Sequence, residues 1–166
     1  MAEAITLLLF VTFQRLAELA WSLRNERRLR LKGAAEFSPG HYPLMVALHS
    51  SWLLALWFGG WDQPVSPYWF AVFAALQAGR AWVLATLGER WTTRIIVLPG
   101  VAPVRSGPYR FMRHPNYLVV ALEIPVLPLA LHLPGIALPF GLANLAMLAW
   151  RIRAEDRALR AAQEAG

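Results

Sequence analysis

Long apolar stretches without charge decide what this chain can fold into. Residues 42–61 carry no formal charge apart from a protonatable His49. A helix of about 20 such residues is long enough to cross the hydrocarbon core of a bilayer. With 57% hydrophobic and 16% charged residues among 166, the chain is also too apolar for an ordinary soluble domain of its size. We therefore expect a single all-α integral membrane domain.

Five membrane-embedded helices are expected in this domain. The apolar spans are residues 5–21, 42–61, 67–87, 116–133 and 136–150. Pro125 and Pro128 should kink the fourth span or shorten its regular part. The mixed residues 24–33 are typical of a solvated helix end and a loop. We divide the domain, residues 1–166, into three N-terminal helices (1–87), a cytoplasmic cofactor-binding insert (88–117), two further helices (116–150) and a charged C-terminal tail helix (151–166).

All Lys and Arg residues except Arg15 and Arg80 lie in three segments outside the spans. The segment after the first span and the insert each hold five Lys and Arg residues, and the tail holds four. Short cytoplasmic loops are enriched in positive charge, so five crossings place the N-terminus outside and all three basic segments, with the C-terminus, in the cytoplasm. We expect an inner or plasma membrane location. The net charge of +6 lies beside apolar spans, so the expected partner is the lipid bilayer and not nucleic acid.

The insert ends in the most unusual polar run of the chain, residues 107–117. It reads Gly-Pro-Tyr-Arg-Phe-Met-Arg-His-Pro-Asn-Tyr. Such a mixture between apolar spans must face water, headgroups or a polar ligand, and we take it as the candidate active site. The simpler alternatives are that its arginines anchor lipid phosphates, that Pro115 starts a helix and that Asn116 caps one. These alternatives do not account for His114 and the flanking tyrosines.

Three sequence elements resemble the isoprenylcysteine carboxyl methyltransferase family of integral membrane methyltransferases. They are Ser106-Gly107-Pro108-Tyr109, Arg113-His114-Pro115-Asn116-Tyr117 and Arg151-x-x-x-Glu155-Asp156-x-x-Leu159. The first half is similar to a bacterial subgroup associated with type III polyketide synthases, whose acceptors are alkylpyrones and related lipidic phenols. The residues that carry this second similarity are Arg15, Glu18, Arg24-Asn25, Gly33-Ala34, Glu36 and His41-Tyr42-Pro43.

The resemblance implies an S-adenosylmethionine-dependent O-methyltransferase acting at the membrane on a lipophilic small molecule: an alkylpyrone, phenol, enol or carboxylate. The arginine that orients the acceptor in the family corresponds to Arg151, and Arg153 competes for that role. Val101 stands where family members often carry a histidine, so only backbone contacts are expected there. The resemblance assigns the cofactor to Val101, Ala102, Pro103, Val104, Tyr109, Arg113, His114, Pro115, Asn116, Tyr117 and Glu155.

The need for a general base depends on the acceptor. A carboxylate or acidic enol is already ionised near neutral pH, whereas a less acidic phenol requires a base. His114, His41 and Glu123 are the candidate bases, and His41 and Glu123 are also candidate substrate contacts. Cysteine is absent, and His41 and His49 have no third ligand at metal spacing, so no metal is expected.

Ionisable residues inside the spans have two possible roles. Arg15 and Glu18 are three residues apart, so they pair on one helical face or contact the substrate. Glu123 and Arg80 pair across two spans or reach the cofactor.

Three other functions remain open from the sequence. They are isoprenylcysteine carboxyl methyltransferase proper, a phospholipid N-methyltransferase whose amine acceptor has less use for an arginine clamp, and a non-enzymatic lipid-binding membrane scaffold.

Overall fold

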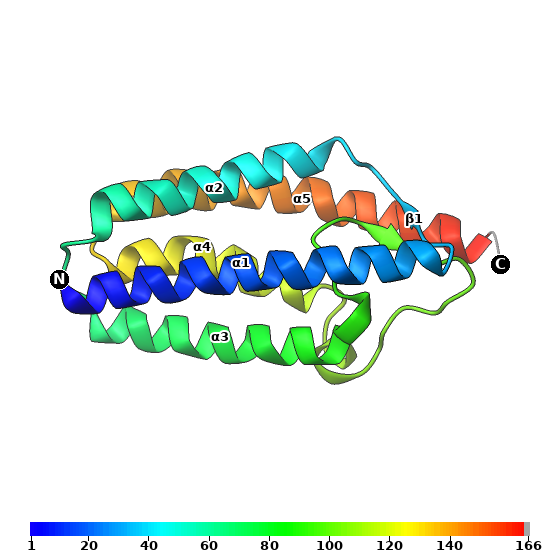
Figure 1. Ribbon diagram of the computed structural model, residues 1–166, viewed down its shortest axis with the longest axis horizontal. Helices are drawn as coiled ribbons and strands as arrows, with labels where there is room; N and C mark the ends of the chain where they lie inside the picture. Colours follow the sequence, from blue (N-terminus) through cyan, green and yellow to red (C-terminus); the bar gives the residue numbers. More distant parts are fainter. Residues whose placement is uncertain (165–166) are drawn as a thin grey trace.

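Five helices form an elongated bundle (Figure 1). The structure is a computed structural model that describes residues 1–164, with only the backbone described for residues 162–164. The helices are α1 (Ala2–Leu31), α2 (His41–Gly60), α3 (Pro67–Leu87), α4 (Pro115–Ala130) and α5 (Pro134–Glu164). α2 lies along α5, and α4 packs against both α3 and α5 behind α1. The predicted all-α membrane fold is confirmed.

Four of the described helices, α1, α2, α3 and α5, are long and apolar enough to cross a membrane. α4 has 16 residues and contains Pro125 and Pro128. Its length of about 24 Å falls short of a hydrocarbon core of about 30 Å. The predicted shortening of this span is confirmed, and the count of five complete crossings stays a prediction.

The structure differs from the predicted elements in three places. α1 continues as helix to Leu31, although residues 24–33 were expected to include a loop. The last span and the charged tail form one unbroken helix, α5, and residues 165 and 166 of the predicted tail lie outside the described residues. A two-stranded antiparallel sheet pairs β1 (Ala35–Glu36) with β2 (Ile96–Val97). The largely β-branched residues 92–98 favour extended structure, as β2 has, but strands this short carry no signal that reveals the pairing with β1.

Pro128 creates an unpaired carbonyl inside α4 that another helix satisfies. A proline has no N–H to offer the residue four positions earlier, which here is Ile124. The indole Nε1 of Trp52 on α2 donates instead to the Ile124 carbonyl oxygen at 3.0 Å. Trp52 and Ile124 are both buried in the main apolar core, so this bond satisfies a backbone group that lipid and water do not reach.

Most of the irregular structure gathers at the end of the bundle opposite the N-terminus. This basic end, as we call it, comprises residues 24–40, 88–114 and 151–164 (Figure 1). The three basic segments of the sequence therefore lie together. A small second core of Ile95, Val97, Ala154 and Ala158 packs the insert against α5 there.

Candidate functional site

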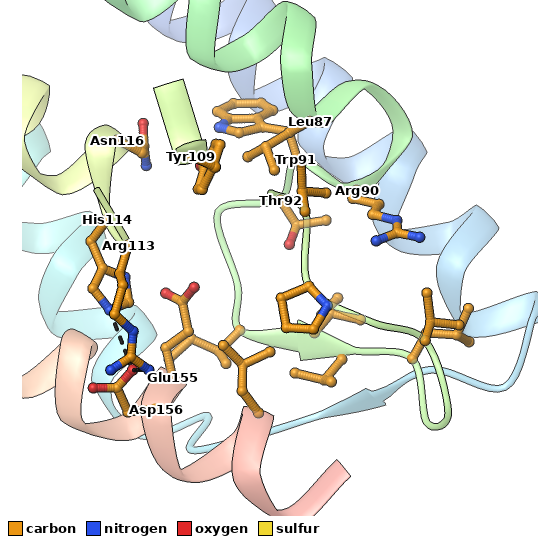
Figure 2. Close-up of a pocket in the computed structure, with 18 of the residues that line it drawn as sticks. Leu87, Arg90, Trp91, Thr92, Tyr109, Arg113, His114, Asn116, Glu155 and Asp156 are labelled. Atoms are coloured by element: carbon orange, nitrogen blue, oxygen red, sulfur yellow. Dashed lines mark hydrogen bonds and ion pairs between the residues drawn. The ribbon is translucent and has the colours of Figure 1, made fainter. Parts of the chain in front are cut away.

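A cavity of about 730 Å³ lies at the basic end. Its walls come from the insert, the first turn of α4 and the C-terminal part of α5. Figure 2 shows side chains from these three segments facing one another across the cavity. Segments far apart in the chain meet around a large open space here, so the cavity is the natural candidate for a ligand site.

A tight 3₁₀ turn, η2 (Gly107–Arg110), shapes the approach to α4. Gly107 has a φ of 56°, in the left-handed region that favours glycine, and a Cβ there would overlap the side chain of Thr86 on α3. Tyr109 of this turn lines the cavity (Figure 2). Burial raises the pKa of Tyr109, and the negative charge of Glu155 raises it further. The phenol therefore remains a hydrogen-bond donor at neutral pH.

The entrance of α4 brings a histidine against an aromatic ring. His114 precedes the helix, and Pro115 is its first residue, where proline's fixed φ suits a helix start. The imidazole stacks on Tyr117, with ring centroids 5.4 Å apart. Nε2 of His114 lies 3.3 Å from Oδ1 of Asp156, and Arg113 donates to the same oxygen at 3.1 Å. Asp156 thus joins α5 to the α4 entrance.

α5 presents Arg151 and Glu155 one turn apart on the face that borders the cavity. The Tyr117 hydroxyl donates to Oε2 of Glu155, whose carboxylate points into the cavity in Figure 2. Arg151 is 6% exposed; its Nη2 donates to the Thr93 carbonyl oxygen at 2.9 Å, and its Nη1 contacts Sδ of Met45 on α2. The guanidinium is therefore fixed by the insert and by α2.

The C-terminal half of α1 supports the insert wall. Nδ2 of Asn25, which is 1% exposed, donates to the carbonyl oxygens of Gly88 at 3.0 Å and Trp91 at 2.9 Å. Ser22, one turn earlier, accepts a hydrogen bond from the Thr93 backbone N–H at 2.7 Å. These bonds fix the start of the insert, so α1 positions one wall of the cavity without lining much of it.

Most predicted cofactor residues lie on this cavity. Pro115 does not line it and serves as the first residue of α4. Arg153, the alternative to Arg151, is exposed and lies off the cavity wall. The predicted residues that do line it are Val101, Ala102, Pro103, Val104, Tyr109, Arg113, His114, Asn116, Tyr117, Arg151 and Glu155.

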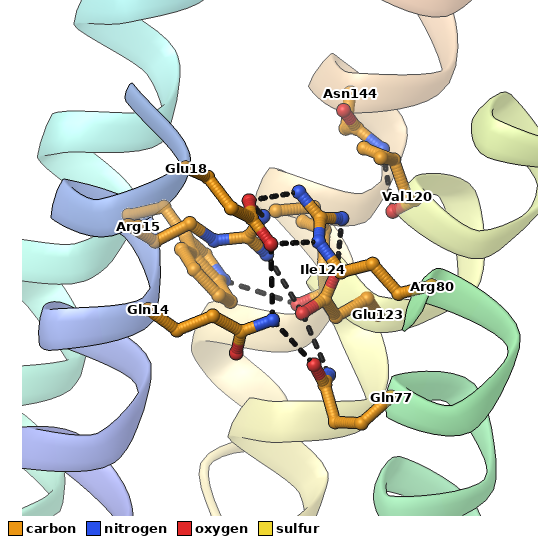
Figure 3. Close-up of polar contacts among 10 residues, drawn as sticks. Gln14, Arg15, Glu18, Gln77, Arg80, Val120, Glu123, Ile124 and Asn144 are labelled. Carbon is orange, nitrogen blue, oxygen red and sulfur yellow. Dashed lines mark hydrogen bonds and ion pairs between the residues drawn. The ribbon is translucent and has the colours of Figure 1, made fainter. Parts of the chain in front are cut away.

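Glu123 lies away from the cavity, inside a buried polar cluster that joins α1, α3 and α4 (Figure 3). Its carboxylate is 3.0 Å from Arg80 and 2.7 Å from Arg15, and Gln77 donates to it at 2.9 Å. Arg80 also pairs with Glu18. The sequence left two roles open for Glu123 and Arg80, pairing with each other or reaching the cofactor. In the structure they pair with each other, across α4 and α3. Neither lines the cavity.

His41, the other candidate substrate contact, is buried at the start of α2 and is not among the residues that line the cavity. Its ring packs edge-on against Trp150, with centroids 6.2 Å apart. Trp150 immediately precedes Arg151.

Sequence reasoning missed several cavity residues. Trp91 and Thr92 line the cavity (Figure 2), yet they belong to a stretch with no motif. One usable signal existed: Ser22 and Asn25, three apart at the end of an apolar helix, form a polar stripe that needs a partner. Among the described residues, no group of three or more His, Asp or Glu side chains is placed to hold a metal ion.

Comparison with known proteins gives a family. Residues 69–161, from early α3 to the end of the cavity-lining part of α5, match the isoprenylcysteine carboxyl methyltransferase (ICMT) family. The chain belongs to this family. ICMT-family proteins are membrane methyltransferases, and the matched residues include the predicted cofactor-binding residues. α1 and α2, which support the insert and contact Arg151, lie before the matched stretch.

Two relatives cover nearly the whole chain. One, from Bacillus subtilis (strain 168), bears the name "Uncharacterized protein YpbQ" and is 39% identical over 159 residues, 93% of this chain and 95% of its own length. The other, an "Uncharacterized protein" from Haemophilus influenzae (strain ATCC 51907 / DSM 11121 / KW20 / Rd), is 28% identical over 151 residues, 87% of this chain and 88% of its own. No solved structure matches the chain. Similarity to these two relatives covers most of the chain, more than the stretch that matches the family.

Proposed function

We propose that this ICMT-family protein is an S-adenosylmethionine-dependent O-methyltransferase that acts at the membrane on a lipophilic acceptor. The observation that carries the proposal is that Arg151 and Glu155 of α5 line the same cavity as three residues of the α4 entrance, His114, Asn116 and Tyr117. These residues lie within the stretch that matches the family. When bound, S-adenosylmethionine supplies a methyl group on a sulfonium cation.

The residues present fit this cofactor. Oδ1 of Asn116 is buried with no hydrogen-bond partner among the residues that the structure describes, so it is available to an N–H or O–H of a ligand. Glu155 supplies a carboxylate for a cationic group. Trp91, Tyr109 and Tyr117 supply aromatic rings for the adenine or the sulfonium.

The charge of the cavity supports an oxygen acceptor. Among the residues whose side chains the structure describes, two carboxylates, Glu155 and Asp156, line it, against a large excess of guanidinium groups. Such a site stabilises an acceptor that is negative or becomes negative, and it disfavours the amine of a phospholipid N-methyltransferase. The lining arginines are Arg90, Arg94, Arg105, Arg110, Arg113, Arg151 and Arg160.

The protein itself positions the acceptor beside the cofactor and excludes water. Arg151 is held at its Nη2 by the Thr93 carbonyl and over the Tyr117 ring at 5.7 Å, so its guanidinium is preorganised beside the cavity. An acceptor oxygen fixed by this group lies within reach of a cofactor held by Glu155. Proximity of this kind accounts for much of the rate that a methyl transfer requires.

We place the basic end, and with it the cavity, in the cytoplasm of an inner or plasma membrane. The support is that all three basic segments lie at this end. The cytoplasm is also where a charged, soluble cofactor is available.

Cofactor binding by detergent-solubilised protein, measured by isothermal titration calorimetry, tests the proposal. We expect the wild type to bind S-adenosylmethionine. Glu155→Gln and Asn116→Ala should weaken binding about tenfold or more, since a lost hydrogen bond to a charged ligand costs about 1.5–3 kcal/mol. Arg27→Ala removes an exposed cation at the same end and should bind as the wild type does. A wild type that does not bind millimolar cofactor would refute the proposed function.

A further inference from the structure

Of the three candidate bases, His114 alone lines the large cavity. His41 is buried at the start of α2, and Glu123 is buried in the polar cluster with Arg80. A general base must come within hydrogen-bond reach of the proton that it removes. A residue outside the cavity does not meet this condition for an acceptor held inside it, so the position of His114 favours this residue.

The two ring nitrogens of His114 have different surroundings. Nε2 lies 3.3 Å from Oδ1 of Asp156. A carboxylate accepts a hydrogen bond, so the hydrogen of the neutral ring is on Nε2 and the free lone pair is on Nδ1. Nδ1 makes no hydrogen bond within the described part of the chain, and it is not among the buried atoms that lack a partner. This nitrogen is therefore open to a molecule in the cavity.

The start of α4 does not use this lone pair. His114 is the N-cap residue, a position at which a side-chain acceptor often takes a hydrogen bond from an N–H of the first turn. No such side-chain bond occurs among the described residues. The backbone carbonyl of His114 accepts instead from the N–H of Tyr117 at 3.1 Å. Nδ1 is thus left over once the helix start is accounted for.

Asp156 fixes the tautomer and the orientation of the His114 ring. Its Oδ1 is held in turn by Arg113 at 3.1 Å, and the ring stacks on Tyr117 (Figure 2). A carboxylate bonded to one nitrogen of a histidine keeps the other nitrogen available as a base and stabilises the imidazolium that forms. The charged and titratable groups around the ring are Arg113 and Tyr117 of its own segment and Arg151, Glu155 and Asp156 of α5.

A cation lies close to the same aromatic residue. The guanidinium carbon of Arg151 is 5.7 Å from the centre of the Tyr117 ring, and the centre of the His114 ring is 5.4 Å from it. All three residues line the cavity. A hydroxyl acceptor needs a base for its proton and a positive charge for the oxygen that becomes negative. His114 and Arg151 supply these two groups.

An exposed apolar row leads along α4 to His114. Leu118 and Leu122 are exposed and follow His114 by about one and two helical turns, and Phe111, just before it, is exposed as well. Residues four apart share one face of a helix, so the two leucines form a continuous strip. A lipophilic acceptor whose tail lies on this strip has its polar end at the entrance of α4.

We propose that His114, positioned by Asp156, is the general base and that the acceptor is an un-ionised hydroxyl, a phenol or enol. This rests on the proposed function. The hydroxyl proton moves to Nδ1 of His114, and an oxygen lone pair forms the bond to the methyl carbon. The carbon–sulfur bond breaks with its electron pair remaining on sulfur, and His114 then releases the proton to water. A carboxylate acceptor carries no such proton and does not need His114.

The sharpest variant is His114→Gln. The glutamine amide keeps a donor near the position of Nε2, for Asp156, and removes the basic Nδ1. Asp156→Asn tests the positioning role, because its amide can donate to Nε2 and so move the ring hydrogen to Nδ1. His132→Asn is the matched control. His132 is exposed in the α4–α5 connection, lines neither cavity and has a φ of 55°, which asparagine tolerates.

The first measurement needs no methyl transfer. A 3-nitrophenol carrying a dodecyl chain, mostly un-ionised in neutral water, is bound in the presence of S-adenosylhomocysteine. Absorbance reports the phenolate, and calorimetry in buffers of different ionisation enthalpy reports proton release. Wild type and His132→Asn should form the phenolate without releasing a proton, because His114 takes it. His114→Gln should leave the probe as the phenol or release its proton to the buffer. Identical behaviour of wild type and His114→Gln, or no binding of the probe to the wild type, would overturn the proposal.

The second measurement compares 5-pentadecylresorcinol with palmitate as methyl acceptors. On the resorcinol, His114→Gln should lower kcat by about a hundredfold or more, and the remaining rate should rise with pH only as the acceptor itself ionises. Asp156→Asn should lower kcat on the resorcinol by about tenfold or more. Both variants should keep most of their activity on palmitate, and His132→Asn should match the wild type on both acceptors.

Cofactor binding separates the possible failures. His114→Gln should bind S-adenosylmethionine as the wild type does; a loss of tenfold or more would show that His114 holds the cofactor, as the family resemblance implies, and would refute its role as the base. An unchanged rate on the resorcinol, an equal loss on palmitate, or no transfer to the resorcinol by wild type that binds the cofactor would also refute that role. Absence of cofactor binding by the wild type would instead refute the proposed function.

Discussion

At the scale of single residues, Gly107 is the described glycine at which an added Cβ would meet the nearest neighbouring atom. Its φ of 56° strains any other residue, and a Cβ there collides with Thr86. Gly100 also has a positive φ, 72°, but its Cβ would meet nothing within 4 Å. Alanine variants at these two positions therefore distinguish the cost of backbone strain from the cost of steric overlap.

We expect Gly100→Ala to cost about 1–2 kcal/mol of unfolding free energy from strain alone. Gly107→Ala should cost about 1–3 kcal/mol more, since the overlap displaces η2. It should also weaken S-adenosylmethionine binding, because Tyr109 moves with the turn. Thermal unfolding in detergent measures the loss of stability, and isothermal titration calorimetry measures the loss of cofactor binding. Equal losses in both variants would contradict the collision with Thr86.

The sequence predicted those site residues that a local motif marks. Tyr117 and Glu155 could be found in this way, although nothing in the sequence shows that the one donates to the other. Nothing in the sequence predicted that Asn25 bonds Trp91, because their contact joins positions 66 apart in the chain. A long-range hydrogen bond leaves no periodic trace, so only the folded structure reveals it.

At the scale of elements, the buried polar cluster joins α1 to α3 and α4 through ion pairs and hydrogen bonds (Figure 3). Glu18 and Arg80 are each less than 10% exposed, and their side chains pair. Removal of Arg80 leaves two carboxylates, Glu18 and Glu123, with the single guanidinium of Arg15, so the cluster carries a net negative charge in a low-dielectric interior. Removal of both Glu18 and Arg80 leaves Arg15 paired with Glu123.

Arg80→Leu should therefore lower stability by about 3–5 kcal/mol, and the double variant Glu18→Leu/Arg80→Leu should recover part of that loss. Arg28→Leu is the control, since Arg28 and Glu89 form an exposed pair worth less than about 1 kcal/mol. Thermal unfolding in one detergent compares all three. A double variant no more stable than Arg80→Leu would mean that Glu18 contributes little through Arg80.

The helices were largely predictable, because spans of apolar residues are a property of the local sequence. The β1–β2 pairing and the continuation of α1 to Leu31 were not. Arg30 of this last turn pairs with both Glu26 and Glu36, so charges that suggested a loop stabilise a helix instead. Tertiary partners decided the structure of a stretch whose composition was ambiguous.

At the scale of the whole molecule, the arrangement of charge predicts the orientation in the membrane. Arg27 lies at the basic end, and Asp62 lies in the connection between α2 and α3 at the other end. The chain has no cysteine, so a single engineered thiol reports its own location.

We expect a membrane-impermeant maleimide to label Asp62→Cys in intact cells. Arg27→Cys should be labelled only after the cytoplasmic face is exposed, as in inverted vesicles, because short basic segments stay on that side. The cysteine-free wild type is the control for background. Labelling of Arg27→Cys in intact cells would place the basic end outside and refute the orientation.

The unbroken course of α5 has a mechanical consequence. Leu138 and Leu142 are exposed on the apolar part of the same rod that carries Arg151 and Glu155. A continuous helix transmits a change of tilt along its whole length, and a bilayer of different thickness changes the preferred tilt of a spanning helix. We therefore expect a change of bilayer thickness to act, through α5, on the contacts that Glu155 and Asp156 make with the α4 entrance.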